Sequence, residues 1–340
     1  MNTRVVNTKP ISFRHRLRRE VGAQFFRGMF NGLSRIATLH PHAKPEHHGV
    51  RVIRNVAYGP RNRNEHLLDV YLPKEARGPL PVVLYVHGGA FRILSKDSHF
   101  VMGIAYARRG YAVFNINYRL APRHPYPAAL EDACLAYEWL VHHAEGYGGD
   151  ISRLVLAGES AGANLVTALT LATVYKRSEG FARAVFETGV VPRAVVPACG
   201  VFDITGAGDI VTRKPKMHPF IADRIRELQE IYLAGTPAHI SRDFADPLVV
   251  LERGDVPSRP IPPFFLPVGT KDPLLNDTRR LARALRSLGA TAVDTYYPGE
   301  VHAFHALVFR ESAKKCWRDT FSFLKDHVQP HESNQDQLHL

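Results

Sequence analysis

The sequence predicts an α/β protein with a mostly parallel, eight-stranded sheet that is flanked by helices on both faces. Three observations favour this class. Past residue 49, short β-rich runs bounded by Gly and Pro alternate with helical patterns, which is the order of elements in a parallel sheet with crossover helices. The helical patterns between the β-rich runs are 10–20 residues long, as expected for a largely parallel sheet covered on both faces. No stretch is long and apolar enough to predict a transmembrane helix.

The expected elements follow one another in a regular order. Residues 50–59 and 65–73 are expected to form a first strand pair joined by a turn at 61–64. Six further strands are expected at residues 81–89, 111–120, 153–160, 193–203, 262–272 and 292–299. Helical patterns occupy residues 99–110, 127–146, 160–177, 278–289 and 308–328. Residues 49–328 are therefore expected to form one catalytic domain, followed by a polar tail at 329–340.

Residues 205–263 interrupt the alternation because they are Pro-rich and only partly helical. We expect them to form an insertion above the sheet.

The positive charge is concentrated at the N-terminal end. The net charge is +12, and residues 1–65 hold thirteen Lys/Arg against three Asp/Glu. The rest of the chain is close to neutral, so nucleic acid is not expected as a partner. Apolar side chains recur in this arm at steps of four or three, as on one face of an amphipathic helix: Phe13, Leu17, Val21, Phe25, Met29, Leu33 and Ile36. Residues 1–48 are expected to form basic amphipathic helices docked on their own protein. Membrane-surface contact through residues 1–40 and a transit peptide are the alternatives.

The three cysteines, Cys134, Cys199 and Cys316, are scattered and form no CxxC pair. This spacing argues against a disulfide framework and against a thiolate metal site. It favours a reducing compartment, and a cytoplasmic location is expected.

The segment Gly158–Gly162, with the sequence GESAG, lies where a β-rich run gives way to a helical pattern. In a G-x-S-x-G turn, the serine occupies a strained strand-to-helix corner, and the glycines avoid collisions between Cβ atoms and the neighbouring backbone. The start of the following helix also offers N–H groups and a positive dipole end to a developing oxyanion. The pattern predicts that Ser160 is a nucleophile. The alternative is a glycine-flanked serine that caps a helix.

A serine nucleophile requires backbone N–H donors for the oxyanion that forms on the substrate. Residues 85–91, with the sequence YVHGGAF, follow the third expected strand and contain two adjacent glycines. Because glycines let the backbone approach a substrate closely, the N–H groups of Gly89 and Ala90 are expected to join that of Ala161. A Gly-Gly turn at the end of a strand is the alternative.

The nucleophile also requires a base and an acid. A serine hydroxyl is weakly nucleophilic at neutral pH and needs an imidazole within hydrogen-bond reach. His302 follows the last expected strand, and Asp272 ends the strand before it. Both positions lie at the carboxyl edge of the sheet, and Asp272 suits the acid that orients the imidazole. Ser160, Asp272 and His302 occur in the order typical of a G-x-S-x-G nucleophile.

Other residues compete for these roles. His305 and the pairs His47-His48 and His142-His143 are alternatives to His302. Asp277 competes with Asp272 but suits the start of a helix, where it would cap or support the helix. His302 and His305 lie one turn apart, but no HExxH motif or Cys partner accompanies them, so no metal is expected.

The motifs together resemble the hormone-sensitive-lipase-like branch of the α/β-hydrolases. The resemblance covers about residues 50–325 and rests on the segments HGGAF, NYRLAPRHPYPAALED, GESAGANL, ADPLV, GTKDPLLND and YPGEVHAF. It implies an α/β-hydrolase fold with a helical cap, built from the N-terminal helices and from an insertion after the sixth strand. It also implies that Ser160, Asp272 and His302 form the triad, and that Gly88, Gly89 and Ala90 line the oxyanion loop.

Two positions depart from the family pattern. Ala90 replaces the third glycine of the oxyanion loop, so its methyl group crowds the site and is expected to alter the acyl preference. Ala163 replaces a common glycine, which we expect to be neutral. Tyr118, Arg119 and Asp132 follow the pattern and are interpreted as a buried charge network.

The sequence thus predicts a serine carboxylesterase that acts on short- to medium-chain acyl esters through an acyl-enzyme. No metal and no organic cofactor are expected. The expected partner is a small-molecule ester, and a homodimer is left open. An amidase or lactonase with the same triad is the alternative within enzymes, and a non-catalytic ligand-binding receptor is the alternative outside them.

Overall fold

A computed structural model describes residues 28, 44–59, 63–76, 78–213, 217–237 and 240–328. Within these residues, the predicted α/β architecture is confirmed. Eight strands form one sheet in the order β1-β2-β4-β3-β5-β6-β7-β8. The helices predicted for residues 1–48 lie almost entirely outside the described residues, and the polar tail at 329–340 lies wholly outside them.

The sheet is parallel except at one edge. Both β1 with β2 and β2 with β4 pair antiparallel, whereas every pair from β4 to β8 is parallel. The strands are β1 (Val50–Ala57), β2 (Leu67–Pro73), β3 (Leu80–Val86), β4 (Ala112–Ile116), β5 (Gly149–Glu159), β6 (Ala194–Ala198), β7 (Phe264–Gly269) and β8 (Ala292–Tyr297). Because β5 lies between β3 and β6, the loops that follow these three strands meet at one edge of the sheet.

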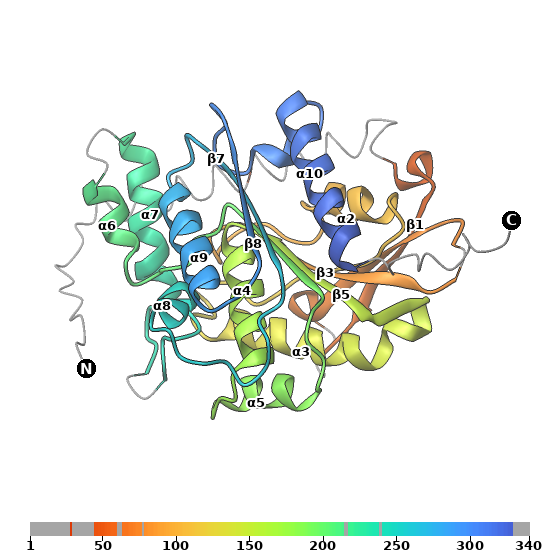
Figure 1. Ribbon diagram of the computed structural model, residues 1–340, viewed down its shortest axis with the longest axis horizontal. Coiled ribbons are helices and arrows are strands. Elements are labelled where there is room, and N and C mark those ends of the chain that lie inside the picture. Colours follow the sequence, from red (N-terminus) through yellow and green to blue (C-terminus); the bar gives the residue numbers. More distant parts are fainter. Residues whose placement is uncertain are drawn as a thin grey trace, which may run out of the picture.

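Helices cover both faces of the sheet (Figure 1). They are α2 (Phe100–Ala107), α3 (Ala128–His143), α4 (Ala161–Val174), α5 (Gly180–Glu187), α9 (Leu275–Ser287) and α10 (Glu311–Val328). Successive side chains of a strand point to opposite faces. Thus Val83 and Tyr85 of β3 pack with side chains of α2 and α10, whereas Val82 and Leu84 pack with those of α3 and α4. This double burial explains why the central strands β3, β4, β6 and β7 are apolar almost throughout, in contrast to the edge strands β1 and β8.

Three helices lie between β6 and β7: α6 (Ala207–Arg213), α7 (Pro219–Tyr232) and α8 (Pro247–Glu252). The first two pack against each other, whereas α8 packs against α4 and α9. In Figure 1, α6 and α7 lie at one end of the molecule, beyond α9. Leu248 and Leu251 of α8 are fully buried in the main core. Within the expected insertion at 205–263, therefore, α8 forms part of the layer that covers the sheet.

Asn164 holds together the two ends of the segment that contains α6 and α7. Its side-chain amide donates hydrogen bonds to the backbone oxygens of Val201 (2.8 Å) and Ala245 (2.9 Å). Asn164 is fully buried in the first turn of α4. A buried amide of this kind is costly to leave unpaired, so the chain is expected to leave and re-enter the domain at fixed points.

Short 3-10 turns complete the chain at η2 (Pro45–His48), η3 (Asn64–His66), η4 (Ala144–Tyr147) and η5 (Phe304–Ala306). None of the helices formed by the described residues is both apolar enough and long enough to cross a membrane.

Candidate active site

Ser160 occupies the corner between β5 and α4. Its backbone angles are φ 53° and ψ −115°, a region that side chains rarely adopt. A Cβ atom on Gly158 would lie 2.7 Å from the carbonyl carbon of Gly162, and a Cβ on Gly162 would lie 2.1 Å from the backbone oxygen of Val86. Both glycines are therefore required by the close approach of backbone to backbone. The Ser160 N–H donates to the Ala198 oxygen on β6 at 3.0 Å.

The structure brings Ser160, His302 and Asp272 together. The His302 Nε2 atom lies 2.9 Å from Ser160 Oγ, and its Nδ1 atom lies 2.9 Å from Asp272 Oδ2. Because a carboxylate can only accept at this contact, the proton lies on Nδ1, and Nε2 is free to accept the Ser160 proton. The other Asp272 oxygen accepts the Leu274 N–H at 2.8 Å.

Asp272 and His302 differ in how far their side chains are buried. The Asp272 side chain is fully buried, whereas that of His302 is 36% exposed. Burial by itself lowers the pKa of His302, but the charge and hydrogen bond of Asp272, with a smaller contribution from Glu159, raise it above the ordinary histidine value. The site therefore stabilises an imidazolium on His302.

The residues after β3 form a loop of unusual backbone conformation. Gly89 has φ 114°, and a Cβ on it would lie 2.0 Å from the Ile93 backbone oxygen. Ala90 and Phe91 also have positive φ angles, 53° and 58°. Among the described residues, the N–H groups of Gly89, Ala90 and Ala161 donate no backbone hydrogen bond. They are available to an oxygen atom of a ligand.

His87 orients this loop. Its Nδ1 atom lies 2.7 Å from the Gly88 carbonyl oxygen, and the ring stacks on Tyr118 at 4.3 Å between centroids. Burial and the neighbouring His99 lower the pKa of His87 to about 3, so the ring is neutral and donates from Nδ1. Because C=O and N–H point in opposite directions across a trans peptide, fixing the Gly88 carbonyl also fixes the direction of the Gly89 N–H.

The other histidines have different surroundings. His305 contacts Glu159, with Nε2 lying 3.0 Å from Oε2. The His143 Nδ1 lies 2.7 Å from the backbone oxygen of Trp139 on α3. The pair His47-His48 lies in η2, before β1. Of the expected candidates for the base, only His302 is placed within hydrogen-bond distance of Ser160 by the described contacts.

Asp277, the alternative acid, lies in the first turn of α9. Its carboxylate accepts the Phe202 N–H at 3.1 Å, and burial raises its pKa to about 7. It supports the start of the insertion.

The expected charge network forms only in part. The Arg119 side chain pairs with Asp132 at 2.8 Å, and the Arg119 N–H donates to the same carboxylate at 2.7 Å. His66, which the sequence did not single out, also contacts Asp132, at 3.1 Å. Tyr118 does not join this network. Its hydroxyl instead donates to the backbone oxygen of His87 at 2.9 Å, so it supports the oxyanion loop.

One group of side chains in the described part of the chain has donors close enough for a metal ion. Cys199 lies beside Asp272 and His302, and their donor atoms are within 4.8 Å of one another. The carboxylate and the imidazole already hydrogen-bond each other. Burial, reinforced by the charges of Asp272 and Glu159, raises the pKa of the Cys199 thiol well above its usual range. The thiol is therefore neutral, and the set fits a hydrogen-bonded triad better than a metal site.

Comparison with known proteins agrees with this geometry. The sequence profile of the α/β-hydrolase fold matches residues 83–306. The chain belongs to this α/β-hydrolase family. Carboxylesterase NlhH of Mycobacterium tuberculosis is 29% identical over 255 residues, which cover 73% of this α/β-hydrolase and 75% of the relative. An acetyl-hydrolase of Streptomyces hygroscopicus is 31% identical over 236 residues, covering 68% of this chain and 71% of its own.

Solved structures agree as well. A bacterial esterase of the hormone-sensitive lipase family superposes on this α/β-hydrolase with a TM-score of 0.67 at 25% identity, covering 88% of this chain and 97% of that chain. The resemblance predicted from the motifs is thus confirmed.

Sequence reasoning missed His87, as well as Glu159 with its partner His99. The signal for His87 was its place directly before the glycine pair. Glu159 stands inside the G-x-S-x-G motif, where only the serine and glycines were interpreted.

Proposed function

We propose that the protein is a serine carboxylesterase that hydrolyses short- to medium-chain acyl esters. The observation that carries this proposal is the line of contacts from Asp272 through His302 to the Ser160 hydroxyl, each at 2.9 Å. The relatives named carboxylesterase and acetyl-hydrolase support the ester substrate, and the acetyl group in the second name supports a short acyl chain.

In the first step, Ser160 Oγ attacks the ester carbonyl carbon while its proton passes to His302 Nε2. The carbonyl electron pair moves onto oxygen, and the resulting oxyanion accepts hydrogen bonds from the N–H groups of Gly89, Ala90 and Ala161. Removing one such donor costs other serine hydrolases about 3–4 kcal/mol of transition-state stabilisation. Asp272 stabilises the imidazolium that has formed.

In the second half of the reaction, the tetrahedral intermediate collapses and the bond to the alcohol oxygen breaks. His302 returns its proton to this oxygen, the alcohol leaves, and the acyl group stays on Ser160. A water molecule then gives a proton to His302 and attacks the acyl carbon. The second collapse releases the carboxylic acid and re-protonates Ser160. Every step uses groups of the chain, the substrate and water.

The proposal is tested by hydrolysis of p-nitrophenyl esters, from acetate to palmitate, by the wild-type protein and by Ser160→Ala. We expect a rate that peaks at short or medium chains and falls by at least about 10⁴-fold in the variant. A fluorophosphonate probe should label the wild type and not the variant. Equal background rates from both proteins would contradict the esterase proposal.

The alternatives are separated by the same two measurements. Labelling of Ser160 without ester hydrolysis would favour an amidase or lactonase, and anilides and lactones would then be assayed. No labelling and no hydrolysis would favour a ligand-binding receptor.

We also propose a weak contact between residues 1–40 and membrane surfaces. The excess of Lys/Arg in this arm and its amphipathic spacing support it. Co-sedimentation with anionic phosphatidylserine vesicles should decrease on deletion of residues 1–40, and no binding by the intact protein would contradict it. The cytoplasmic location is likewise proposed, and the free, buried thiols of Cys134, Cys199 and Cys316 support it.

A further inference from the structure

Glu159, the residue before the nucleophile, carries a buried carboxylate between two imidazoles. It is 6% exposed. Its Oε1 atom lies 2.7 Å from His99 Nε2, and its Oε2 atom lies 3.0 Å from His305 Nε2. A buried carboxylate is costly unless such partners compensate it. The three side chains therefore form one unit, which we call the Glu159 cluster.

The Glu159 cluster joins three separate segments of the active site. Glu159 ends β5 and is bonded through its backbone to Ser160. His305 lies in η5, three residues after the base His302. The oxyanion loop passes close to the same side chain, since a Cβ on Gly88 would lie 3.2 Å from Glu159 Cγ and 3.3 Å from its carboxylate oxygen Oε1. Segments that carry the nucleophile, the base and the oxyanion donors thus meet at the Glu159 side chain.

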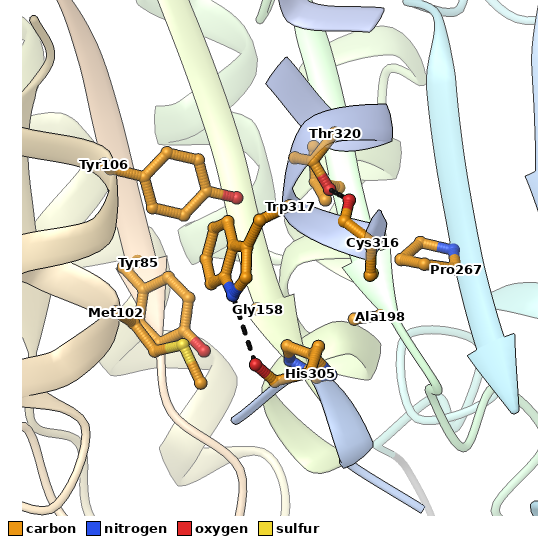
Figure 2. Close-up of a pocket in the computed structure, with 11 residues that line it drawn as sticks. Tyr85, Met102, Tyr106, Gly158, Ala198, Pro267, His305, Cys316, Trp317 and Thr320 are labelled. Atoms are coloured by element: carbon orange, nitrogen blue, oxygen red, sulfur yellow. Dashed lines mark hydrogen bonds between the residues drawn. The ribbon is translucent and has the colours of Figure 1, made fainter. Parts of the chain in front are cut away.

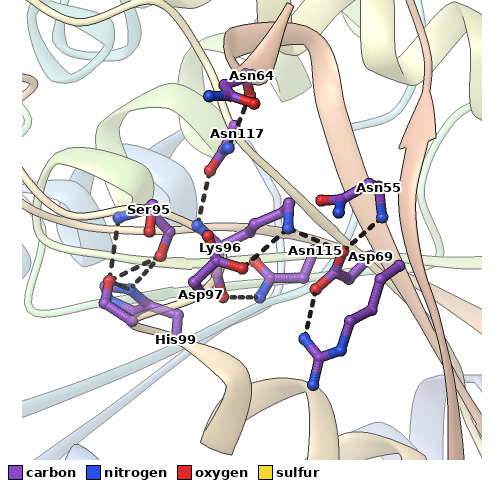
Figure 3. Close-up of polar contacts among 11 residues, drawn as sticks. Asn55, Asn64, Asp69, Ser95, Lys96, Asp97, His99, Asn115 and Asn117 are labelled. Atoms are coloured by element: carbon purple, nitrogen blue, oxygen red, sulfur yellow. Dashed lines mark hydrogen bonds and ion pairs between the residues drawn. The ribbon is translucent and has the colours of Figure 1, made fainter. Parts of the chain in front are cut away.

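His99 is itself firmly held. Its Nδ1 atom lies 2.9 Å from Ser98 Oγ and 3.2 Å from the Ser95 backbone oxygen (Figure 3). Lys96, three residues before His99, ties this segment to the sheet, because its buried ammonium pairs with Asp69 of β2 at 2.9 Å. His99 is therefore a fixed point against which Glu159 can be positioned.

His305 is held by a residue of α10. The Trp317 Nε1–H of α10 donates to the backbone oxygen of His305 at 3.1 Å (Figure 2). The His305 side chain is 8% exposed. Because η5 follows the His302 loop directly, a contact that fixes His305 also restrains the backbone that carries His302.

The charge of the cluster reaches the catalytic base. Burial by itself raises the pKa of Glu159, but His99 and His305 lower it well below its usual range, so the carboxylate is ionised. This negative charge adds to that of Asp272 in raising the pKa of His302. The other titratable groups that the Glu159 charge influences are Tyr85, His87, Tyr118 and Cys199. None of these four carries a negative charge at neutral pH.

We propose that Glu159 is a positioning residue for ester hydrolysis: its carboxylate, held by His99 and His305, fixes the nucleophile corner, the oxyanion loop and the His302 loop relative to one another. This inference rests on the proposed esterase function. Small displacements of reacting groups reduce the rate of the chemical step more than they weaken substrate binding. We therefore expect the Glu159 cluster to affect kcat more than KM.

The test uses the full chain, p-nitrophenyl butyrate and the variant Glu159→Gln, which keeps the size of the side chain and removes its charge. We expect kcat to fall about 10- to 100-fold with KM changed by less than about threefold. The acid limb of the kcat/KM profile should move to lower pH, because loss of a nearby anion lowers the pKa of His302.

Two further variants separate charge from position. Glu159→Asp keeps the charge but shortens the side chain, so kcat should fall while the acid limb stays at the wild-type pH. The matched control Glu138→Gln lies on α3 and should leave both quantities unchanged. A wild-type kcat and acid limb in Glu159→Gln would overturn the inference.

Failure of folding is covered by thermal melts and by a fourth variant. If Glu159→Gln does not fold, wild-type kcat in both Glu159→Asp and His305→Gln would overturn the inference. A wild-type protein that hydrolyses no ester and takes up no fluorophosphonate would instead refute the esterase function on which it rests.

Discussion

The nucleophile corner, residues 158–162, and the oxyanion loop, residues 87–94, both hold strained backbone, but they are held in different ways. In the corner, backbone packs directly on backbone. Gly158 and Gly162 have no side chain, so Gly158 can pack against the backbones of Gly162 and Val86, and Gly162 against that of Val86. The corner is also tied by one hydrogen bond to β6. The backbone of the corner is therefore shaped by contacts at the centre of the sheet, and the side chain of Glu159 is the part of it that reaches His99 and His305.

The oxyanion loop depends on side chains from elsewhere in the chain. Tyr118 donates to the backbone oxygen of His87, and Phe91 stacks on Tyr232 of α7 at 3.7 Å between centroids. Arg92 pairs with Glu227 of the same helix. We therefore expect a substitution in the corner to destabilise the whole domain. A substitution near the loop should reduce kcat by a smaller factor, and residues of α7 should have such an effect.

The largest effect on the stability of the fold is expected from Gly162→Ala. The new Cβ would lie 2.1 Å from the Val86 oxygen, and neither backbone can move without opening the sheet. We expect a loss of about 3 kcal/mol or more in the free energy of unfolding, measured by urea denaturation. The control Gly180→Ala has no atom within 4 Å of the new Cβ and should change stability by less than about 0.5 kcal/mol. Equal changes in the free energy of unfolding for the two variants would show that the backbone of the corner can shift to accommodate the new Cβ.

Asp272→Asn should remove activity while leaving the corner intact. Without the carboxylate, the His302 ring is no longer held in its orientation and its imidazolium form is no longer stabilised by a negative charge. We therefore expect kcat to fall by about 10⁴-fold. In the wild type, His302 must be neutral to act as the base. Its raised pKa means that activity is lost as pH falls through a value above the ordinary pKa of histidine.

In Asp272→Asn, the residual activity should persist to lower pH, because the carboxylate that contributes most to raising the pKa of His302 is removed. A pH profile of kcat/KM checks the sign. An acid limb at the same or a higher pH would contradict it.

Tyr232→Leu tests whether the loop depends on α7. It removes the ring that stacks on Phe91 beside the oxyanion donors. We expect kcat to fall about 10-fold, since misplaced donors weaken oxyanion stabilisation. Phe244→Leu is the matched control because Phe244 is similarly buried but packs edge to face against Phe181. It should lower the melting temperature by a similar amount with kcat unchanged, and equal losses of kcat would contradict the coupling.

The smallest effect is expected from Ala90→Gly. Ala90 has φ 53°, a conformation that costs a residue with a Cβ about 1 kcal/mol. Glycine removes this cost but adds freedom to the unfolded chain, so stability should change by less than about 1 kcal/mol. Removal of the methyl group should favour bulkier acyl chains in the p-nitrophenyl ester series. An unchanged chain-length profile would show that Ala90 does not limit the acyl group.

Much of the fold could be predicted because its strands and helices depend on patterns of neighbouring residues in the sequence. Apolar runs gave the strands, and the glycines around Ser160 gave the strand-to-helix corner. His302 and Asp272 could be found because each follows a strand whose end lies at the same edge of the sheet. In contrast, α5 was not predicted, and Tyr118 was assigned to the wrong neighbours, since its partner His87 lies 31 residues away.

The Glu159 cluster could not be predicted for the same reason. Glu159 meets His99 from 60 residues away, and a pattern of period two or 3.6 contains no information on such a pairing. Its place inside the G-x-S-x-G motif was visible, but a glutamate there is equally compatible with solvent. Only the packing of β5 under the oxyanion loop shows that the side chain is buried.

The hydrogen bonds of Asn164 have a consequence for how this enzyme can change. Because one amide holds both ends of the segment from Val201 to Ala245, which contains α6 and α7 but not α8, we expect this segment to be exchangeable while the rest of the domain stays unchanged. Its composition and length can vary while the ends meet the same side chain, provided that the replacement supplies a ring for Phe91. New substrate ranges can then be acquired by recombination of one segment, with the chemistry of the parent kept.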